Sequence, residues 1–193
     1  MSFQQRTTGL LAALALVLPA STHAQTSSSE LLSSLSFRHI GVVGNRIASV
    51  AGVAGNPLVY YAGAASGGLW KTEDGGVRWR PLFDELDVHS VGALAVSLSD
   101  PQIVWAGTGE PHIRSNVTVG DGVYKSMDGG DNWQHMGLDA TGRISRLVIH
   151  PTNPDIVYAA ALGHAHAPQP ERGIYRTLDG GETWQPPVRM SPP

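Results

Sequence analysis

Near its end the chain contains the stretch Thr177-Leu178-Asp179-Gly180-Gly181-Glu182-Thr183-Trp184, and residues 72–79 and 126–133 repeat its layout. In such a turn the aspartate can accept hydrogen bonds from backbone N–H groups further along, and the glycines supply positive φ angles. The closing tryptophan can bury its large ring between sheets. We therefore interpret the shared residues as structural; they are Asp74, Gly76, Trp79, Asp128, Gly130, Trp133, Asp179, Gly181 and Trp184.

Each of these turns closes a longer repeat that contains several short apolar runs. A β-branched run is followed by an Asn-Pro or Asp-Pro dipeptide, which favours turn initiation, and then by a second and a third run. The first runs are 47–50, 91–96 and 144–149; the dipeptides are Asn56-Pro57, Asp100-Pro101 and Asn153-Pro154; the second runs are Val59-Tyr60, Val104-Trp105 and Val157-Tyr158; the third runs are 68–71, 122–125 and 173–176. Four short strands per repeat are typical of a propeller blade.

The repeats therefore predict an all-β fold, a β-propeller of four-stranded antiparallel blades. About three blades are expected, at 45–83, 89–137 and 142–188. A propeller closes with about four to eight blades, so the ring is incomplete. Either the chain is a fragment of a longer protein or copies associate to complete a ring. We favour the fragment because no polar capping segment follows Trp184.

The composition fits a soluble globular protein, with 193 residues, 41% hydrophobic and 15% charged. Lys plus Arg number 13 against 16 Asp plus Glu, so no basic excess favours nucleic acid or an acidic membrane surface. We expect no nucleic-acid partner and no cofactor. Because the chain has no cysteine, packing alone must hold the fold.

The N-terminus has the pattern of an export signal. Arg6 precedes an apolar run over 9–20, and small residues follow up to Ala24. The run is too short to cross the ~30 Å hydrocarbon core of a bilayer, so no stable membrane insertion is expected after cleavage. We predict a signal peptide over 1–24, a flexible Ser/Thr-rich lead-in over 25–35 and the partial propeller over 36–193, exported to the periplasm or the exterior.

The turns resemble the Asp-box, or BNR repeat, Ser/Thr-x-Asp-x-Gly-x-Thr-Trp, of sialidases, sortilin-like ectodomains and xyloglucan-hydrolysing enzymes. The third copy matches fully, whereas Arg78 and Asn132 replace the threonine in the others. The lead-in Phe37-Arg38-His39-Ile40-Gly41 is similar to the start of large exported bacterial propeller proteins of the sortilin-like or BNR-repeat glycosyl hydrolase kind. The resemblance implies a propeller from Ser36 to about Trp184, as the N-terminal part of such a protein.

The catalytic residues that the resemblance implies do not carry over. In xyloglucan-hydrolysing relatives a catalytic Asp precedes the Gly-Gly of an early blade, where this chain has Ala64-Ala65-Ser66-Gly67-Gly68. Sialidases open with Phe/Tyr-Arg-Ile-Pro, where this chain has Asn45-Arg46-Ile47-Ala48. Sortilin ectodomains carry a cysteine-rich module, which a chain without cysteine cannot supply.

The candidate site lies in the loops between second and third strands, which are longest in the second and third repeats. They run over 109–116 and 163–172 and should lie side by side on the face opposite the turns. Glu110 and Glu171 are candidates for the acid pair of a glycosidase, whose carboxyl groups lie about 5 to 10 Å apart. The alternatives are ion pairs with Arg114 and Arg172 on a solvated surface, or non-catalytic contacts to a ligand. The predicted ligand-binding residues are His112, Arg114, His164, His166 and Arg172.

Three of those residues are histidines, which raises the question of a metal. Imidazoles two positions apart on an extended segment face the same side, as in His164-x-His166. Loop histidines are more often solvated or hydrogen-bonded, so we expect no metal. The links 84–89 and 139–143 reach the same face and could add contacts to sugar hydroxyls.

The leading hypothesis is an exported propeller segment that serves as a binding or interaction scaffold for a polysaccharide or a protein. The alternative is a fragment of a glycoside hydrolase whose longer form uses Glu110 or Glu171. A third possibility is a gene remnant without function.

Overall fold

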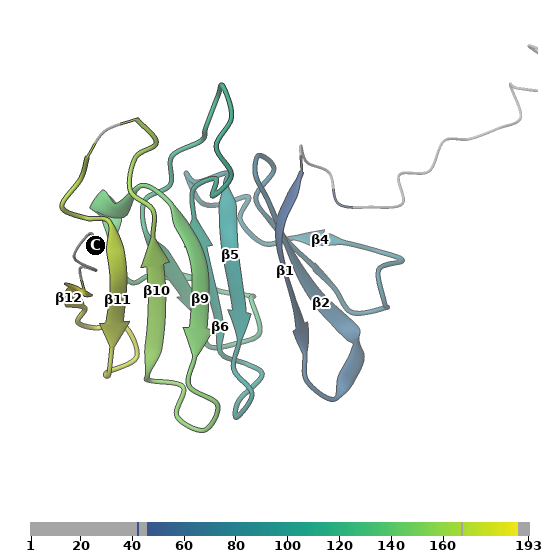
Figure 1. Cartoon of the computed structure of the whole chain (residues 1–193). Helices are drawn as coiled ribbons and strands as arrows, with labels where there is room; N and C mark the ends of the chain where they lie inside the picture. Colours follow the sequence, from purple (N-terminus) through teal and green to yellow (C-terminus); the bar gives the residue numbers. More distant parts are fainter. Residues whose placement is uncertain (1–41, 43–45, 167, 189–193) are drawn as a thin grey trace, which may run out of the picture. The chain divides into compact units, whose positions relative to one another are not determined.

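The computed structural model describes residues 42, 46–166 and 168–188. The predicted signal peptide, the lead-in and the motif at 37–41 lie outside these residues. Three four-stranded antiparallel sheets, each with its strands in sequence order, and one short 3-10 turn, η1 (Asp139–Thr141), make up the regular structure (Figure 1). The predicted fold of four-stranded antiparallel blades is confirmed. None of the described residues forms a helix long and apolar enough to span a bilayer.

The strands of each blade follow one another along the chain. The first blade holds β1 (Ile47–Val53), β2 (Asn56–Ala64), β3 (Leu69–Thr72) and β4 (Arg80–Pro81); the second holds β5 (Val91–Val96), β6 (Val104–Thr108), β7 (Val123–Ser126) and β8 (Gln134–His135); the third holds β9 (Ile144–Ile149), β10 (Val157–Ala161), β11 (Gly173–Thr177) and β12 (Gln185–Val188).

Two details of the first blade differ from the sequence prediction. Its hairpin turns at Ala54-Gly55, where Gly55 has φ 77°, so Asn56 already belongs to β2. The aromatic residue of its second strand is Tyr61 and not Tyr60, because Tyr61 pairs with Lys71 as Trp105 pairs with Lys125. A shift of one residue moves a side chain to the other face of a strand.

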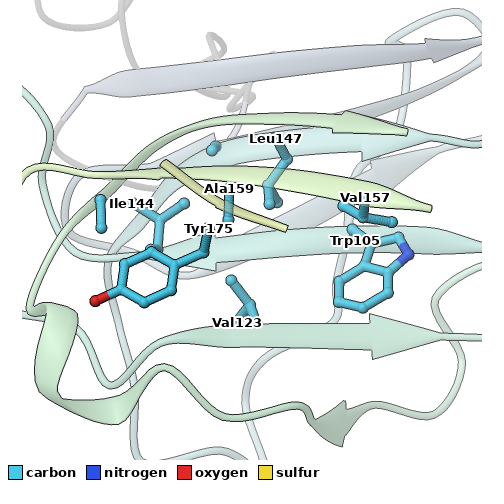
Figure 2. Packing of buried hydrophobic residues seen from close by; sticks show 9 residues of the cluster. Trp105, Val123, Ile144, Leu147, Val157, Ala159 and Tyr175 are labelled. Atoms are coloured by element: carbon cyan, nitrogen blue, oxygen red, sulfur yellow. The ribbon is translucent and has the colours of Figure 1, made fainter. Parts of the chain in front are cut away.

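The apolar cores lie between the blades. One core combines Trp105 and Val123 of the second blade with Ile144, Leu147 and Val157 of the third (Figure 2). The other core combines residues of the first and second blades, among them Tyr61, Leu69, Phe83, Val91, Val104 and Tyr124. A blade of this protein therefore buries its apolar side chains mainly against its neighbour.

Glycines allow the inner strands to approach. An added Cβ at Gly107 of β6 would lie 2.4 Å from Cγ2 of Ile144, and one at Gly63 of β2 would lie 2.7 Å from Cγ1 of Val91. Only glycine fits under these β-branched residues, because closer packing than van der Waals contact forces the backbone to shift. The first residue of each following blade thus sits directly against the second strand of the blade before it.

The three Asp-Gly-Gly turns share one hydrogen-bond pattern. A threonine or serine hydroxyl donates to the aspartate Oδ1, at 2.9, 2.8 and 2.7 Å in the first to third turns. The backbone N–H four residues after the aspartate donates to the same oxygen at 2.9 Å in every turn. The backbone N–H of the second glycine donates to the hydroxyl, at 2.9, 2.8 and 2.9 Å. These hydrogen bonds close each turn on itself through its aspartate and its hydroxyl.

The turns also bind the preceding blade. The Tyr61 hydroxyl donates to the carbonyl of Gly129 at 2.8 Å, and Lys125 Nζ donates to the carbonyl of Gly180 at 3.0 Å. Trp184 Nε1 donates to the carbonyl of Met136 in the second blade at 2.7 Å, and its ring packs edge-on against Trp105. The sequence had indicated only that each turn holds its own blade.

The outer flanks of the first and third blades are exposed among the described residues. Tyr158 is 39% exposed, whereas its counterparts Tyr61 and Trp105 are 1% and 0% exposed. At the other end Ile47 is 45% exposed, whereas its counterparts Val91 and Ile144 are fully buried. Within residues 46–166 and 168–188, nothing covers these two flanks as the middle blade is covered on both sides.

The turns give the fold a predictable acid sensitivity. Hydrogen bonds from the backbone and side chain of Asn132 lower the pKa of Asp128 to about 2. A carboxyl with a lowered pKa stabilises the folded state fully above its ordinary pKa near 4, and this contribution is lost as the pH falls through about 2. We expect the free energy of unfolding, from urea titrations, to fall between pH 4 and 2, and to fall less in Asp128→Asn.

The matched control is Glu182→Gln, which removes an exposed carboxyl from the third turn. Equal pH slopes in the unmodified chain and in Asp128→Asn would contradict the assignment.

Candidate functional site

The β2–β3, β6–β7 and β10–β11 loops and the links between blades gather at one end of the sheets, which we call the loop face. The backbone N–H of Gly109 donates to Ser90 at 2.9 Å, that of Gly120 to Gly142 at 2.7 Å, and that of Leu162 to Arg143 at 2.8 Å. The long loops 109–122 and 162–172 lie on this face beside the links, and the Asp-Gly-Gly turns lie at the opposite end (Figure 1). The expected face is thus formed.

Two glycines allow the first long loop, 109–122, and the link that follows its blade to touch. Gly109 has φ 85°, and an added Cβ there would lie 2.3 Å from the carbonyl oxygen of Gly142 and 2.8 Å from Cα of Arg143. Gly142 has φ 66°, and its added Cβ would lie 3.2 Å from the ring of His164. Both positions need glycine for its positive φ and its small size. They bring Glu110 and His164 to neighbouring places on the loop face.

Glu110 is the most buried acid of the face. Its side chain is 0% exposed, and its Oε1 accepts hydrogen bonds from Arg114 Nε at 2.8 Å and from Arg46 Nη2. Arg114 Nη1 also donates to Asn116 Oδ1 at 2.7 Å. Among the described residues Glu110 Oε2 is buried and has no hydrogen-bond donor. Arg46 precedes β1 and Glu110 follows β6, so this ion pair joins the first two blades.

A cavity of about 230 Å³ lies beside this ion pair, and we call it the arginine hollow. The Arg46 side chain is 45% exposed, whereas that of Glu110 is fully buried. Arg46 is therefore the exposed charged group of the hollow. The hollow is lined by Arg46, Ile47, Ala48, Ala65, Glu110 and His112.

A second cavity of about 470 Å³ lies between the two long loops, and we call it the histidine groove. Its wall combines amide, hydroxyl and imidazole groups with small apolar side chains. The backbone N–H of His164 donates to Gln169 Oε1 at 2.6 Å, which holds the loop closed on itself. The lining residues are Ser115, Asn116, Val117, Val119, His164, Ala165 and His166.

Two arginines support the third-blade loop. Arg143 is buried, and its Nε donates to the carbonyl of Gly163 at 2.7 Å, while Nη1 has no hydrogen-bond acceptor among the described residues. Burial lowers the pKa of Arg143, and the nearby charge of Arg172 lowers it further. Arg172 Nε donates to the carbonyl of Leu162 at 2.8 Å. These contacts with backbone carbonyls hold the loop in shape.

The structure brings some predicted site residues together and separates others. Glu110 and Arg114 form one ion pair beside His112, and His164 and His166 share the histidine groove. Glu171 lines neither cavity; its backbone carbonyl accepts a hydrogen bond from the Tyr175 hydroxyl at 2.9 Å. The proposed acid pair of Glu110 and Glu171 therefore has no shared cavity in the part of the chain that is described.

The histidines likewise divide between the two cavities. Within the described ranges, no three His, Cys, Asp or Glu side chains cluster so as to hold a metal ion. Sequence reasoning missed Arg46 as a partner of Glu110. Its signal is that Arg46 stands directly before the first strand of its blade, as Arg143 does before Ile144.

The ion pair predicts different roles for the two candidate acids. Glu110→Gln should lower the free energy of unfolding by about 1–3 kcal/mol, because it removes the buried carboxylate that Arg46 and Arg114 both bind. Glu171→Gln should change it by no more than about 0.5 kcal/mol, as is usual at the surface. Urea denaturation at neutral pH measures both. Equal effects of the two substitutions would contradict the structural role of Glu110.

Comparison with known proteins places the chain among propellers. No protein-family model matches it. A xyloglucanase of a Paenibacillus species is 28% identical over 137 residues, covering 64% of this chain and 13% of that enzyme. The chain thus spans about one eighth of the length of this curated relative.

Solved structures with a similar fold include two GH74 enzymes. An ancestral GH74 enzyme has a TM-score of 0.60 and 22% identity, covering 81% of this chain and 19% of its own. The GH74 enzyme of Niastella koreensis has a TM-score of 0.55 and 20% identity, covering 74% and 21%. YCF48 bound to D1 peptide has a TM-score of 0.50 and 23% identity, covering 72% and 40%. These likenesses show the β-propeller fold.

Proposed function

We propose that the chain is an exported β-propeller segment that binds a carbohydrate through its loop face. The observation that carries this proposal is the histidine groove, whose lining comes from both long loops and includes amide, hydroxyl and imidazole groups. Asn116, His164 and His166 offer donors and acceptors together, which suits hydroxyl groups that also do both. Likeness to a xyloglucanase supports a carbohydrate over a protein as the ligand.

Export and repeat type belong to the same proposal. We propose that residues 1–24 are a signal peptide, that 25–35 are a lead-in and that the turns are Asp-boxes of the BNR kind. The apolar run over 9–20 and the hydrogen bonds of Asp74, Asp128 and Asp179 support these assignments. A polysaccharide ligand outside the cell would agree with export.

Calorimetric titration with xyloglucan oligosaccharides tests the groove. We expect His164→Ala and His166→Ala each to weaken binding about 5- to 10-fold, because one hydrogen bond contributes about 1 kcal/mol. His150→Ala is the control, since His150 lies in the hairpin after β9, away from the groove. Absence of binding, or equal loss in the control, would count against the groove.

A glycoside hydrolase fragment is the second candidate, favoured by the same xyloglucanase likeness. This candidate is tested by measuring the release of reducing ends from xyloglucan by the unmodified chain, by Glu110→Gln and by Glu171→Gln. Loss of release with retained binding in one variant would support catalysis by that acid. Release unaffected by either change would remove both from a catalytic role. The burial of Glu110 between two guanidinium groups favours binding over proton transfer.

We also propose that another blade covers the exposed flank of the third blade. Tyr158 and Arg176 stand where Trp105 and Lys125 contact the next turn. The blade could come from a longer polypeptide or from a second copy of this chain. Light scattering after size exclusion separates them: twice the chain mass supports self-association, and a monomer supports the longer polypeptide.

A further inference from the structure

The ion pair beside the arginine hollow holds more positive than negative charge. Arg114 and Arg46 both donate to the same oxygen of Glu110, so one carboxylate faces two guanidinium groups. Arg114 is the more buried of the two and also binds Asn116. Arg46 is therefore the exposed, surplus cation, and the exposed His112 lines the same hollow. A guanidinium in this setting favours a carboxylate ligand, which it binds through two parallel hydrogen bonds.

The second polar feature is an acceptor. Oε2 of Glu110 is buried without a donor among the described residues. A buried acceptor without a hydrogen bond destabilises the free protein, so a ligand that donates a hydrogen bond to it would gain affinity. A hydroxyl group close to the ligand's carboxylate fits this requirement.

The size of the hollow limits the ligand. Its volume of about 230 Å³ compares with about 30 Å³ for one water molecule, so it holds one small ring or the end of a longer chain. Ile47, Ala48 and Ala65 give it an apolar wall, against which the C–H face of a sugar ring can lie. Charge, acceptor and wall together describe an acidic sugar.

We propose that the arginine hollow binds a uronate sugar, with the carboxylate on Arg46 and a neighbouring hydroxyl donating to Glu110 Oε2. The proposal rests on the proposed carbohydrate function and names a second, acidic sugar class beside the histidine groove. Arg114 neutralises Glu110 and so limits the repulsion between the two carboxylates. No covalent step is involved.

Titration of the chain with sodium glucuronate and with glucose tests the charge directly, because the two sugars differ only at C6. NMR or calorimetry should give a Kd at least 10-fold lower for glucuronate, and raising the salt from about 50 mM to about 500 mM should weaken its binding. Arg46→Gln should weaken glucuronate binding at least 10-fold, and His112→Ala should weaken it less. Arg78→Gln is the control, since Arg78 is exposed in the first Asp-Gly-Gly turn.

Equal affinity for the two sugars, or unchanged affinity in Arg46→Gln with an unchanged melting temperature, would overturn the proposal. If Arg46→Gln melts early, His112→Ala and the salt dependence still decide it. A short peptide with a free carboxyl terminus, compared with its amide, tests the other source of a carboxylate; tighter binding of the peptide acid than of glucuronate also overturns it. Neutral xyloglucan oligosaccharides that still bind would leave the histidine groove intact, so the two failures are distinguishable.

Discussion

The packing of one blade against the next is the interaction on which this protein depends. A four-stranded sheet has two faces and little interior, so a single blade cannot bury its own apolar side chains. Trp105 makes this plain: it belongs to the second blade, is fully buried, and packs with Ile144, Leu147 and Trp184 of the third. The Asp-Gly-Gly turns then present carbonyl groups that the preceding blade binds through Tyr61 and Lys125. The apolar side chains of one blade are thus buried only when the neighbouring blade is folded.

The packing of neighbouring blades also determines the geometry of the loop face. Arg46 comes from the start of the first blade and Glu110 from the second, and their ion pair requires the two blades to be in register. The histidine groove likewise needs loops from two blades, brought together by Gly109 and Gly142. Both cavities are therefore formed by neighbouring blades and not by one loop, so a substitution in the inter-blade core is expected to change the shape of both cavities.

Repetition makes the fold predictable, because each turn can be checked against two others. Blade order follows from the spacing of the short strands, and the hydrogen bond that Asp128 accepts within its turn follows from local turn chemistry. The sequence predictions were wrong or incomplete where contacts between strands or blades determine which side chain is buried. Tyr60 and Tyr61 are adjacent aromatics, and only strand register shows which is buried. The sequence places Trp184 in its own turn but cannot reveal its bond to Met136.

The candidate site was less predictable than the fold, because the sequence around a loop glutamate does not show whether its side chain is exposed or buried. Glu110 and Glu171 both stand in long loops with an arginine nearby in the sequence. Glu110 forms an ion pair between two blades, whereas Glu171 lines neither the arginine hollow nor the histidine groove. The deciding residue, Arg46, is remote in sequence from Glu110. Only a comparison of what precedes each first strand, Arg46 and Arg143, would have drawn attention to it.

The exposed flank of the third blade differs from the two buried flanks at one central position. Gly63 and Gly107 make room for Val91 and Ile144 of the next blade, but the corresponding position of the third blade is Ala160. A methyl group there occupies the space that the earlier interfaces leave for a β-branched side chain. A blade that covers Tyr158 must therefore carry a smaller first residue than valine, or lie slightly further away. An interface formed by the proposed further blade would therefore differ from the first two at its centre, while Tyr158 and Arg176 would still offer donors to the same kind of turn.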